Sequence, residues 1–208
     1  MGDKIHMRQI KGIFFRKLTN LQCSLLAGAI LSLLACASAS AKSDVFHDTS
    51  MDFGSIRTVA VMPLVNLTRE QQANDRVRDV FVTALMATSG IYVIPTGEVA
   101  RGIVSAGIAN PTTPTPDEAV KLCKTSKIDA VFTGVLREYG EVRSGTAMAN
   151  VISLSMQLME GQTGKVVWSA DTTQGGIGIV DRLFGGGGQP LNEITEKAVY
   201  EMLDKLFK

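Results

Sequence analysis

Few residues of this chain could carry catalytic chemistry. A nucleophilic triad or a transition-metal site needs histidine, and the chain has two histidines, His6 in a basic run and His47 in a polar segment without periodicity. Glu138 and Glu141 could form a carboxylate pair for acid–base work. Basic residues flank both, which is more typical of a solvated strand end. We therefore predict a protein that is not an enzyme and that holds no metal or cofactor.

Cys36 is a different case, because of the residues that precede it. A basic run is followed by an apolar stretch from Leu21 to Leu34, about fourteen residues long. That is the length of a signal-peptide core, whereas a helix that crosses a bilayer needs roughly 20 apolar residues. The basic run contains Lys4, Arg8, Lys11, Arg16 and Lys17.

The apolar stretch ends in Leu33, Leu34, Ala35 and Cys36, which resemble the lipobox of bacterial lipoprotein precursors. The resemblance implies cleavage before Cys36, a diacylglycerol thioether on its sulfur and an acylated amine. Several acyl chains hold a protein far more firmly than one. Ala37 follows the cysteine in place of the aspartate that often retains lipoproteins in the inner membrane, so the resemblance implies the outer membrane.

We predict three parts: a signal peptide (1–35), a lipidated N-terminus with a flexible tether (36–54), and a periplasmic domain (55–208). The alternative is an ordinary secretory signal cut near Ala39 or Ala41. Five of the 21 basic and one of the 20 acidic residues precede Cys36, which leaves 16 basic against 19 acidic residues. A net charge near −3 gives no footprint for nucleic acid.

The 173 residues from Cys36 onward suit one folded domain. Cys123 is then the remaining cysteine, so no internal disulfide can form. Its position among apolar helix residues predicts a small buried side chain.

The first half of the domain predicts alternating strands and helices. A capping box is expected where Thr115 and Glu118 bond each other's backbone amides, with Pro116 at the first helical position. Thr96 is a second candidate N-cap. Apolar runs and helical spacing predict strands at 56–62 and 91–94 and helices at 70–88, 97–105 and 116–126.

The second half predicts strands at 128–139, 150–159 and 165–173 and a terminal helix at 191–206. The glycines of 160–164 predict an antiparallel hairpin. Apolar and polar residues alternate along 151–158, so one face should meet helices and the other a polar environment. The fold class is therefore α/β: a single three-layer-type sandwich, order βαβααβββα, with a mixed sheet of about five strands and about four helices.

A glycine-rich insert at 175–189 interrupts this order. It lacks the Gly-Lys-Ser/Thr of a P-loop and the spacing of a dinucleotide-binding turn. Its apolar centre is either a patch that meets a partner subunit or lipid, or a loop folded over its own core. Trp168 also has two alternatives: it packs in the core, or it lies at an interface. The candidate interface comprises Trp168, Ile177, Ile179, Val180, Leu183 and Phe184.

Three blocks carry a family resemblance: Val59–Thr68, Ile128–Gly134 and Thr163–Ala170. They resemble periplasm-facing lipoproteins that include CsgG, LpoB and PelC and share a fold with the N-terminal domain of TolB. The last two blocks, with Glu138 and Tyr139 between them, look most like PelC, which implies a ring-forming accessory of a polysaccharide exporter. The chain lacks the long alternating segments of CsgG-like membrane hairpins.

Two functions remain open. The first is an outer-membrane lipoprotein that oligomerises and assists an envelope export or assembly system, with a membrane and other envelope proteins as partners. The second is an LpoB-like activator of a peptidoglycan synthase. The short tether disfavours the second.

Overall fold

The elements follow the predicted order, with additional short strands. The computed structural model describes residues 45–145, 147–177 and 188–207, and within them a seven-stranded mixed sheet with four α-helices. In chain order the elements are β1 (Val45–His47), η1 (Phe53–Ser55), β2 (Thr58–Val61), β3 (Val65–Asn66), α2 (Ala73–Ala87), β4 (Tyr92–Val93), α3 (Thr96–Ala106), α4 (Pro116–Ser126), β5 (Ala130–Ser144), β6 (Ala147–Glu160), β7 (Val166–Gly175) and α6 (Leu191–Leu206).

The sheet joins a parallel half to an antiparallel half. Its strand order is β1-β7-β6-β5-β2-β4, and β3 also pairs with β5. β2 runs parallel to β4 and β5, whereas β5–β6, β6–β7 and β7–β1 are antiparallel. The predicted β6–β7 hairpin is confirmed.

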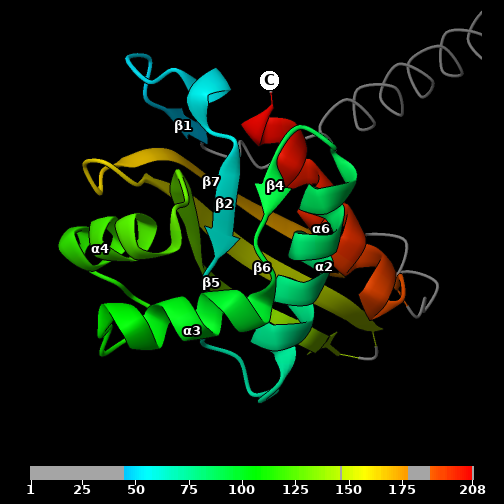
Figure 1. Cartoon of the computed structure of the whole chain (residues 1–208). Coiled ribbons are helices and arrows are strands. Elements are labelled where there is room, and N and C mark those ends of the chain that lie inside the picture. The colour runs from blue at the N-terminus through cyan, green and yellow to red at the C-terminus, as the bar shows by residue number, and fades with distance from the viewer. Residues whose placement is uncertain (1–44, 146, 178–187, 208) are drawn as a thin grey trace, which may run out of the picture. The chain divides into compact units, whose positions relative to one another are not determined.

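Helices cover the two faces of the sheet unequally (Figure 1). α2 and α6 pack together on one face, where Phe81 and Met202 join the main core around Phe132. α3 and α4 pack together on the other face, where Val99 and Leu122 meet β2 and the start of β5. The arrangement confirms the predicted α/β class, with more strands than expected.

The predicted alternation along β6 is confirmed. Ile152, Leu154, Met156 and Leu158 are buried beneath α6. The residues between them point to the opposite face, where Ser153 is buried but Ser155 and Gln157 are more exposed. This leaves a polar stretch of sheet uncovered.

Part of the predicted tether forms structure instead. Residues 45–47 are β1, an edge strand paired with β7 from Val45↔Ala170 to His47↔Trp168. His47 packs edge-to-face on Phe53 of η1, with ring centroids 5.6 Å apart. A three-residue strand is too short to show periodicity, so no sequence pattern predicts it. It forms because β7 offers an edge to pair with. The tether prediction of 36–54 is therefore wrong from Val45 onward.

The capping box of α4 is confirmed. The Glu118 amide donates to Thr115 Oγ1 at 3.3 Å, and the Thr115 amide donates to Glu118 Oε2 at 2.8 Å. For α3 the prediction is wrong, because the N-cap is Pro95 and Thr96 lies inside the helix.

Replacing Thr115 by alanine should therefore lower the free energy of unfolding by about 1 kcal/mol, because it leaves one helix-end amide without its acceptor. Urea unfolding followed by circular dichroism measures this. Thr113→Ala, in the exposed loop before the cap, is the matched control and should change stability by less than about 0.5 kcal/mol.

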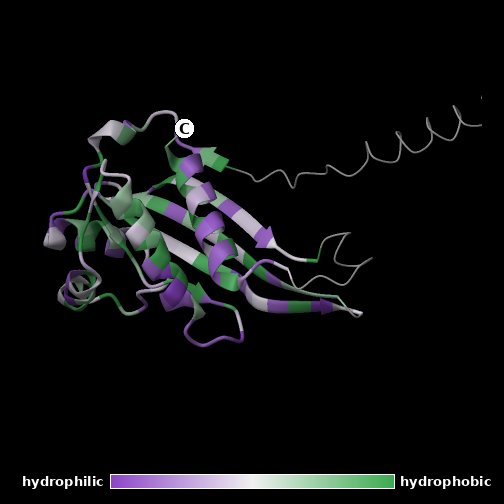
Figure 2. Ribbon diagram, turned by 90° about the vertical axis from the view of Figure 1, so that its right-hand side faces the viewer, coloured by the Kyte–Doolittle hydropathy of each residue, from purple (hydrophilic) through white to green (hydrophobic). Residues whose placement is uncertain are grey.

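β5 and β6 extend beyond the rest of the sheet as a hairpin (Figure 2). Their pairing continues to Ser144↔Ala147, past the predicted end at residue 139. Asn150 holds both ends of the glycine-rich insert: its carbonyl accepts from the Gly176 amide at 2.8 Å, and its Nδ2 donates to the Gln189 carbonyl at 2.9 Å.

Candidate functional site

The uncovered sheet face forms a groove of about 420 Å³. Its floor comes from β5, β6 and β7, and one wall from the loop between α3 and α4. Arg137 enters it at a β-bulge between Leu136 and Glu138, where the register of β5 shifts. Polar residues that line the groove include Thr112, Thr133, Arg137, Ser155, Gln157 and Asp171.

The groove has the chemistry of a binding surface. Its polar lining consists of hydroxyls, one amide, one cation and one carboxylate, and apolar side chains such as Val135 and Met159 lie between them. Within residues 45–145, 147–177 and 188–207, no three His, Cys, Asp or Glu side chains gather in a way that could hold a metal ion. The groove can therefore offer hydrogen bonds to a polar partner.

A second hollow, of about 400 Å³, contains Cys123, Asp129 and Glu160. Asp129 Oδ2 accepts from two consecutive amides at the start of β2, both at 2.8 Å. Glu160 accepts from the Thr163 amide at 2.9 Å and from its hydroxyl. Both carboxylates are thus used to hold turns.

Cys123 is buried, as predicted. Burial, together with the charges of Glu160 and Asp129, raises the pKa of its thiol to about 12. A thiol is nucleophilic only as the thiolate, so Cys123 is inert at neutral pH.

The carboxylate pair considered from the sequence does not converge on a site. Arg143 Nε lies 2.9 Å from Glu141 Oε1, and both side chains are largely exposed. Glu138 precedes them on β5, paired with Ser153. These are solvent-exposed positions along the outer half of β5.

A polar cluster on α6 fastens this helix to β7. Glu201 accepts from Thr172 Oγ1 at 2.7 Å and from Gln174 Nε2, and its other oxygen lies 2.6 Å from Lys205 Nζ. Partial burial acts to raise the pKa of Glu201, but hydrogen bonds from these three side chains outweigh burial and hold its pKa below the usual value.

The cluster makes stability depend on pH. A carboxyl whose pKa is depressed by folding stabilises the fold above its unfolded pKa, and this contribution is lost as the pH falls through the folded pKa. We expect the free energy of unfolding to fall less between about pH 7 and about pH 3 in Glu201→Gln than in the wild type. Glu196→Gln, on the exposed side of α6, controls for the loss of one charge. An equal fall in Glu201→Gln and wild type would contradict this assignment.

The candidate interface residues lie in different places. Trp168 is not at the surface: its side chain is 0% exposed in the main core, and its Nε1 donates to the Lys205 carbonyl at 3.3 Å. Its interface assignment is therefore corrected to a core residue. Ile177 is partly buried at one end of the insert. Ile179, Val180, Leu183, Phe184 and the lipobox residues Leu33, Leu34, Ala35 and Cys36 lie outside the described residues.

The sequence reasoning missed Phe46, which is half exposed on β1. The available signal was the apolar pair Val45-Phe46 within an otherwise polar segment. None of the helices in the described part of the chain is long and apolar enough to cross a membrane.

Comparison with known proteins identifies the family. The profile of GNA1162-like lipoproteins matches residues 48–177, more than half of the chain. The chain belongs to the GNA1162-like lipoprotein family. The predicted resemblance to lipoproteins is thereby confirmed.

Two solved structures have the fold of this GNA1162-like protein. A PelC dodecamer from Paraburkholderia phytofirmans is 16% identical, with a TM-score of 0.55, over 79% of this chain and 96% of that one. The lipoprotein GNA1162 from Neisseria meningitidis is 18% identical, with a TM-score of 0.53, over 72% of this chain and 97% of that one. No curated protein matches the sequence. At this identity the structural matches establish the fold alone.

Proposed function

We propose that this GNA1162-like protein is an outer-membrane lipoprotein, anchored through Cys36, that oligomerises and serves a non-catalytic accessory role in an envelope export or assembly system. The observation that carries the proposal is the match to a lipoprotein family over residues 48–177, which follow a lipobox-like segment that ends at Cys36. The carboxylates and the thiol of the second hollow, which are used in the fold, support a non-catalytic role.

The anchor is tested by Cys36→Ser in the full-length protein. The variant has no sulfur to lipidate, so it should leave the membrane fraction almost completely, whereas the wild type stays there. Mass spectrometry of the wild type should detect the acyl chains on Cys36. Cys123→Ser, which changes the buried cysteine, is the control and should remain membrane-bound. Retention of Cys36→Ser in membranes would contradict the anchor.

Two features support oligomerisation. The structurally similar PelC forms a dodecamer. The groove on the open face of β5–β7 offers polar groups that a neighbouring subunit could bond.

Light scattering coupled to size exclusion, on the Cys36→Ser protein without its signal peptide, tests assembly. We expect a mass that rises to several subunits with concentration. Arg137→Glu reverses the charge of one side chain in the groove and should shift the equilibrium from oligomer towards monomer. Arg101→Glu on α3 should leave this equilibrium unchanged. A wild-type domain that stays monomeric at the highest concentration would refute the oligomer.

The alternative, an LpoB-like activator, requires reach across the periplasm. Because β1 begins at Val45, eight residues (37–44) join Cys36 to the folded domain, and this connection extends at most about 30 Å. This shorter connection weighs further against the alternative. Binding of the purified domain to a peptidoglycan synthase would restore it.

A further inference from the structure

Apolar side chains are exposed at the end of the domain where the N-terminal chain enters it. Phe46 on β1 and Phe207, directly after α6, are each 50% exposed, and Val45 is 39% exposed. In Figure 1 β1 and the C-terminus lie at the same end of the sheet. We refer to Val45, Phe46 and Phe207 as the β1-end patch.

Contacts bring the two segments of the β1-end patch together. A hollow of about 560 Å³ is lined on one side by residues 47–54 and on the other by Leu206 and Phe207. The bond from Trp168 Nε1 to the Lys205 carbonyl fixes the end of α6 beside the strand that pairs with β1. The two segments of the patch therefore lie side by side in the folded domain.

The patch surrounds an open sheet edge. Directly paired residues point to the same face, so Phe46 shares the groove face with Ser169, and Val45 shares the α6 face with Ala170. Among the described strands, β1 is the outermost on its side of the sheet. Both faces of this edge thus present apolar side chains.

We propose that the β1-end patch rests on the lipid surface that holds the acyl chains of Cys36. The inference depends on the proposed anchor, which places Val45 nine residues, or at most about 30 Å, from the membrane. Phenylalanine gains free energy when it enters the headgroup–acyl boundary. Asp48 and Asp52, close to the patch, bond amides of their own turns and favour a zwitterionic lipid surface over an anionic one.

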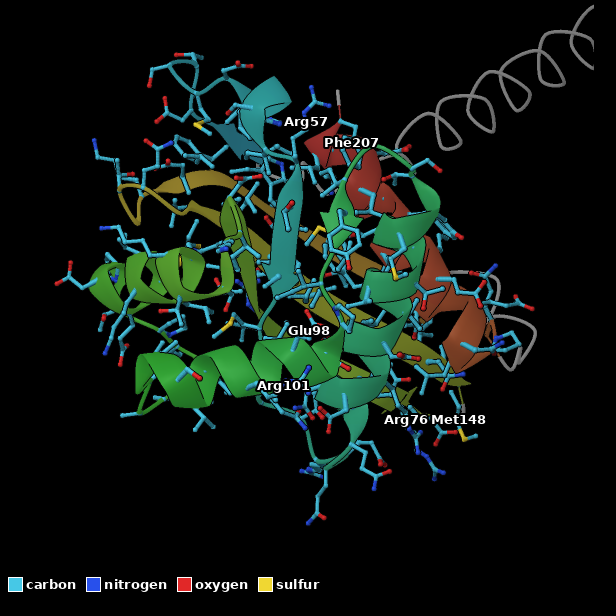
Figure 3. All side chains as sticks on the ribbon, viewed as in Figure 1. Arg57, Arg76, Glu98, Arg101, Met148 and Phe207 are labelled. Atoms are coloured by element: carbon cyan, nitrogen blue, oxygen red, sulfur yellow. The ribbon has the colours of Figure 1, made fainter. Side chains whose placement is uncertain are left out.

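Val104 provides a contrast. It is 80% exposed on α3, but Glu98 and Arg101 of the same helix form a charged pair 3.8 Å apart. Figure 3 shows these two residues at the opposite end of the domain from Phe207. An exposed residue in this region should stay in water.

Depth-dependent quenching tests the inference. Single cysteines replace Phe46, Phe207 or Val104 in the full-length lipidated protein and are labelled with a fluorescent maleimide. Cys36 is blocked by lipid, and Cys123 is buried with a pKa near 12 and does not react. Each protein is placed in phosphatidylcholine vesicles that carry nitroxides close to the headgroup. Probes at 46 and 207 should lose most of their fluorescence, and the probe at 104 should lose none.

The quenching experiment distinguishes three outcomes that would count against the proposals. If the wild type does not float with vesicles, the proposed anchor fails. If it floats but the probes at 46 and 207 stay as bright as the probe at 104, the membrane contact is overturned and the anchor remains. If iodide in water cannot reach these two probes in lipid-free oligomers of the Cys36→Ser protein, a second copy covers the patch, which also overturns the inference.

Discussion

Replacing Trp168 by alanine is expected to lower the free energy of unfolding by about 3–5 kcal/mol. The side chain is completely buried, and its ring stands edge-to-face on Phe132 at a centroid distance of 6.3 Å. Its indole N–H also bonds the end of α6. Because small domains are stable by only about 5–15 kcal/mol, this loss is a large fraction of the total stability.

Urea unfolding followed by far-UV circular dichroism measures the loss. Trp168→Phe keeps an aromatic ring in the core and should cost clearly less than the alanine. Val104→Ala, at an exposed position, should change stability by less than about 0.5 kcal/mol. A Trp168→Ala protein as stable as the wild type would show that this part of the core is misassigned.

Replacing Gly164 by alanine is expected to cost about 2–4 kcal/mol, from backbone strain together with overpacking. Gly164 lies in the β6–β7 hairpin with φ +72°, a conformation that favours glycine. A Cβ there would lie 2.8 Å from the carbonyl carbon of Pro116, at the start of α4. The hairpin would have to move away from the helix it touches.

Gly145 separates the two contributions. It has a similar φ of +62°, but no atom of the described residues lies within 4 Å of a Cβ at this position. Gly145→Ala should therefore cost only about 1 kcal/mol, from the backbone conformation alone. Thermal unfolding of both variants gives the difference, which measures the contact with Pro116. Equal losses in the two proteins would show that the contact adds nothing.

Elements with strong local signals were predictable. α6 begins at Leu191 and ends at Leu206, because its apolar stripe and the preceding proline mark both ends. The capping box of α4 depends on residues three positions apart, so it could be read directly. β1 and β3 have three and two residues, too few for any periodicity, and they exist because β7 and β5 offer free edges.

The candidate site was less predictable, because it depends on distant residues. The groove unites the loop at Thr112 with Arg137 and Asp171, which no local pattern relates. Trp168 shows a second reason. A single tryptophan in a strand is compatible with a core position or an interface position, and only its packing against Phe132 and α6 decides between the two. The apolar centre of the glycine-rich insert stays a prediction.

The pairing of β1 with β7 has a consequence for assembly symmetry. With Cys36 lipidated as proposed, a connection of eight residues holds every copy on one leaflet with the same end towards the lipid. A two-fold axis lying in the membrane plane would turn half of the anchors away from the bilayer, which excludes dihedral assemblies. Rotation about the membrane normal keeps all anchors in place. A short, ordered entry strand thus restricts the protein to cyclic symmetry before any subunit contact forms.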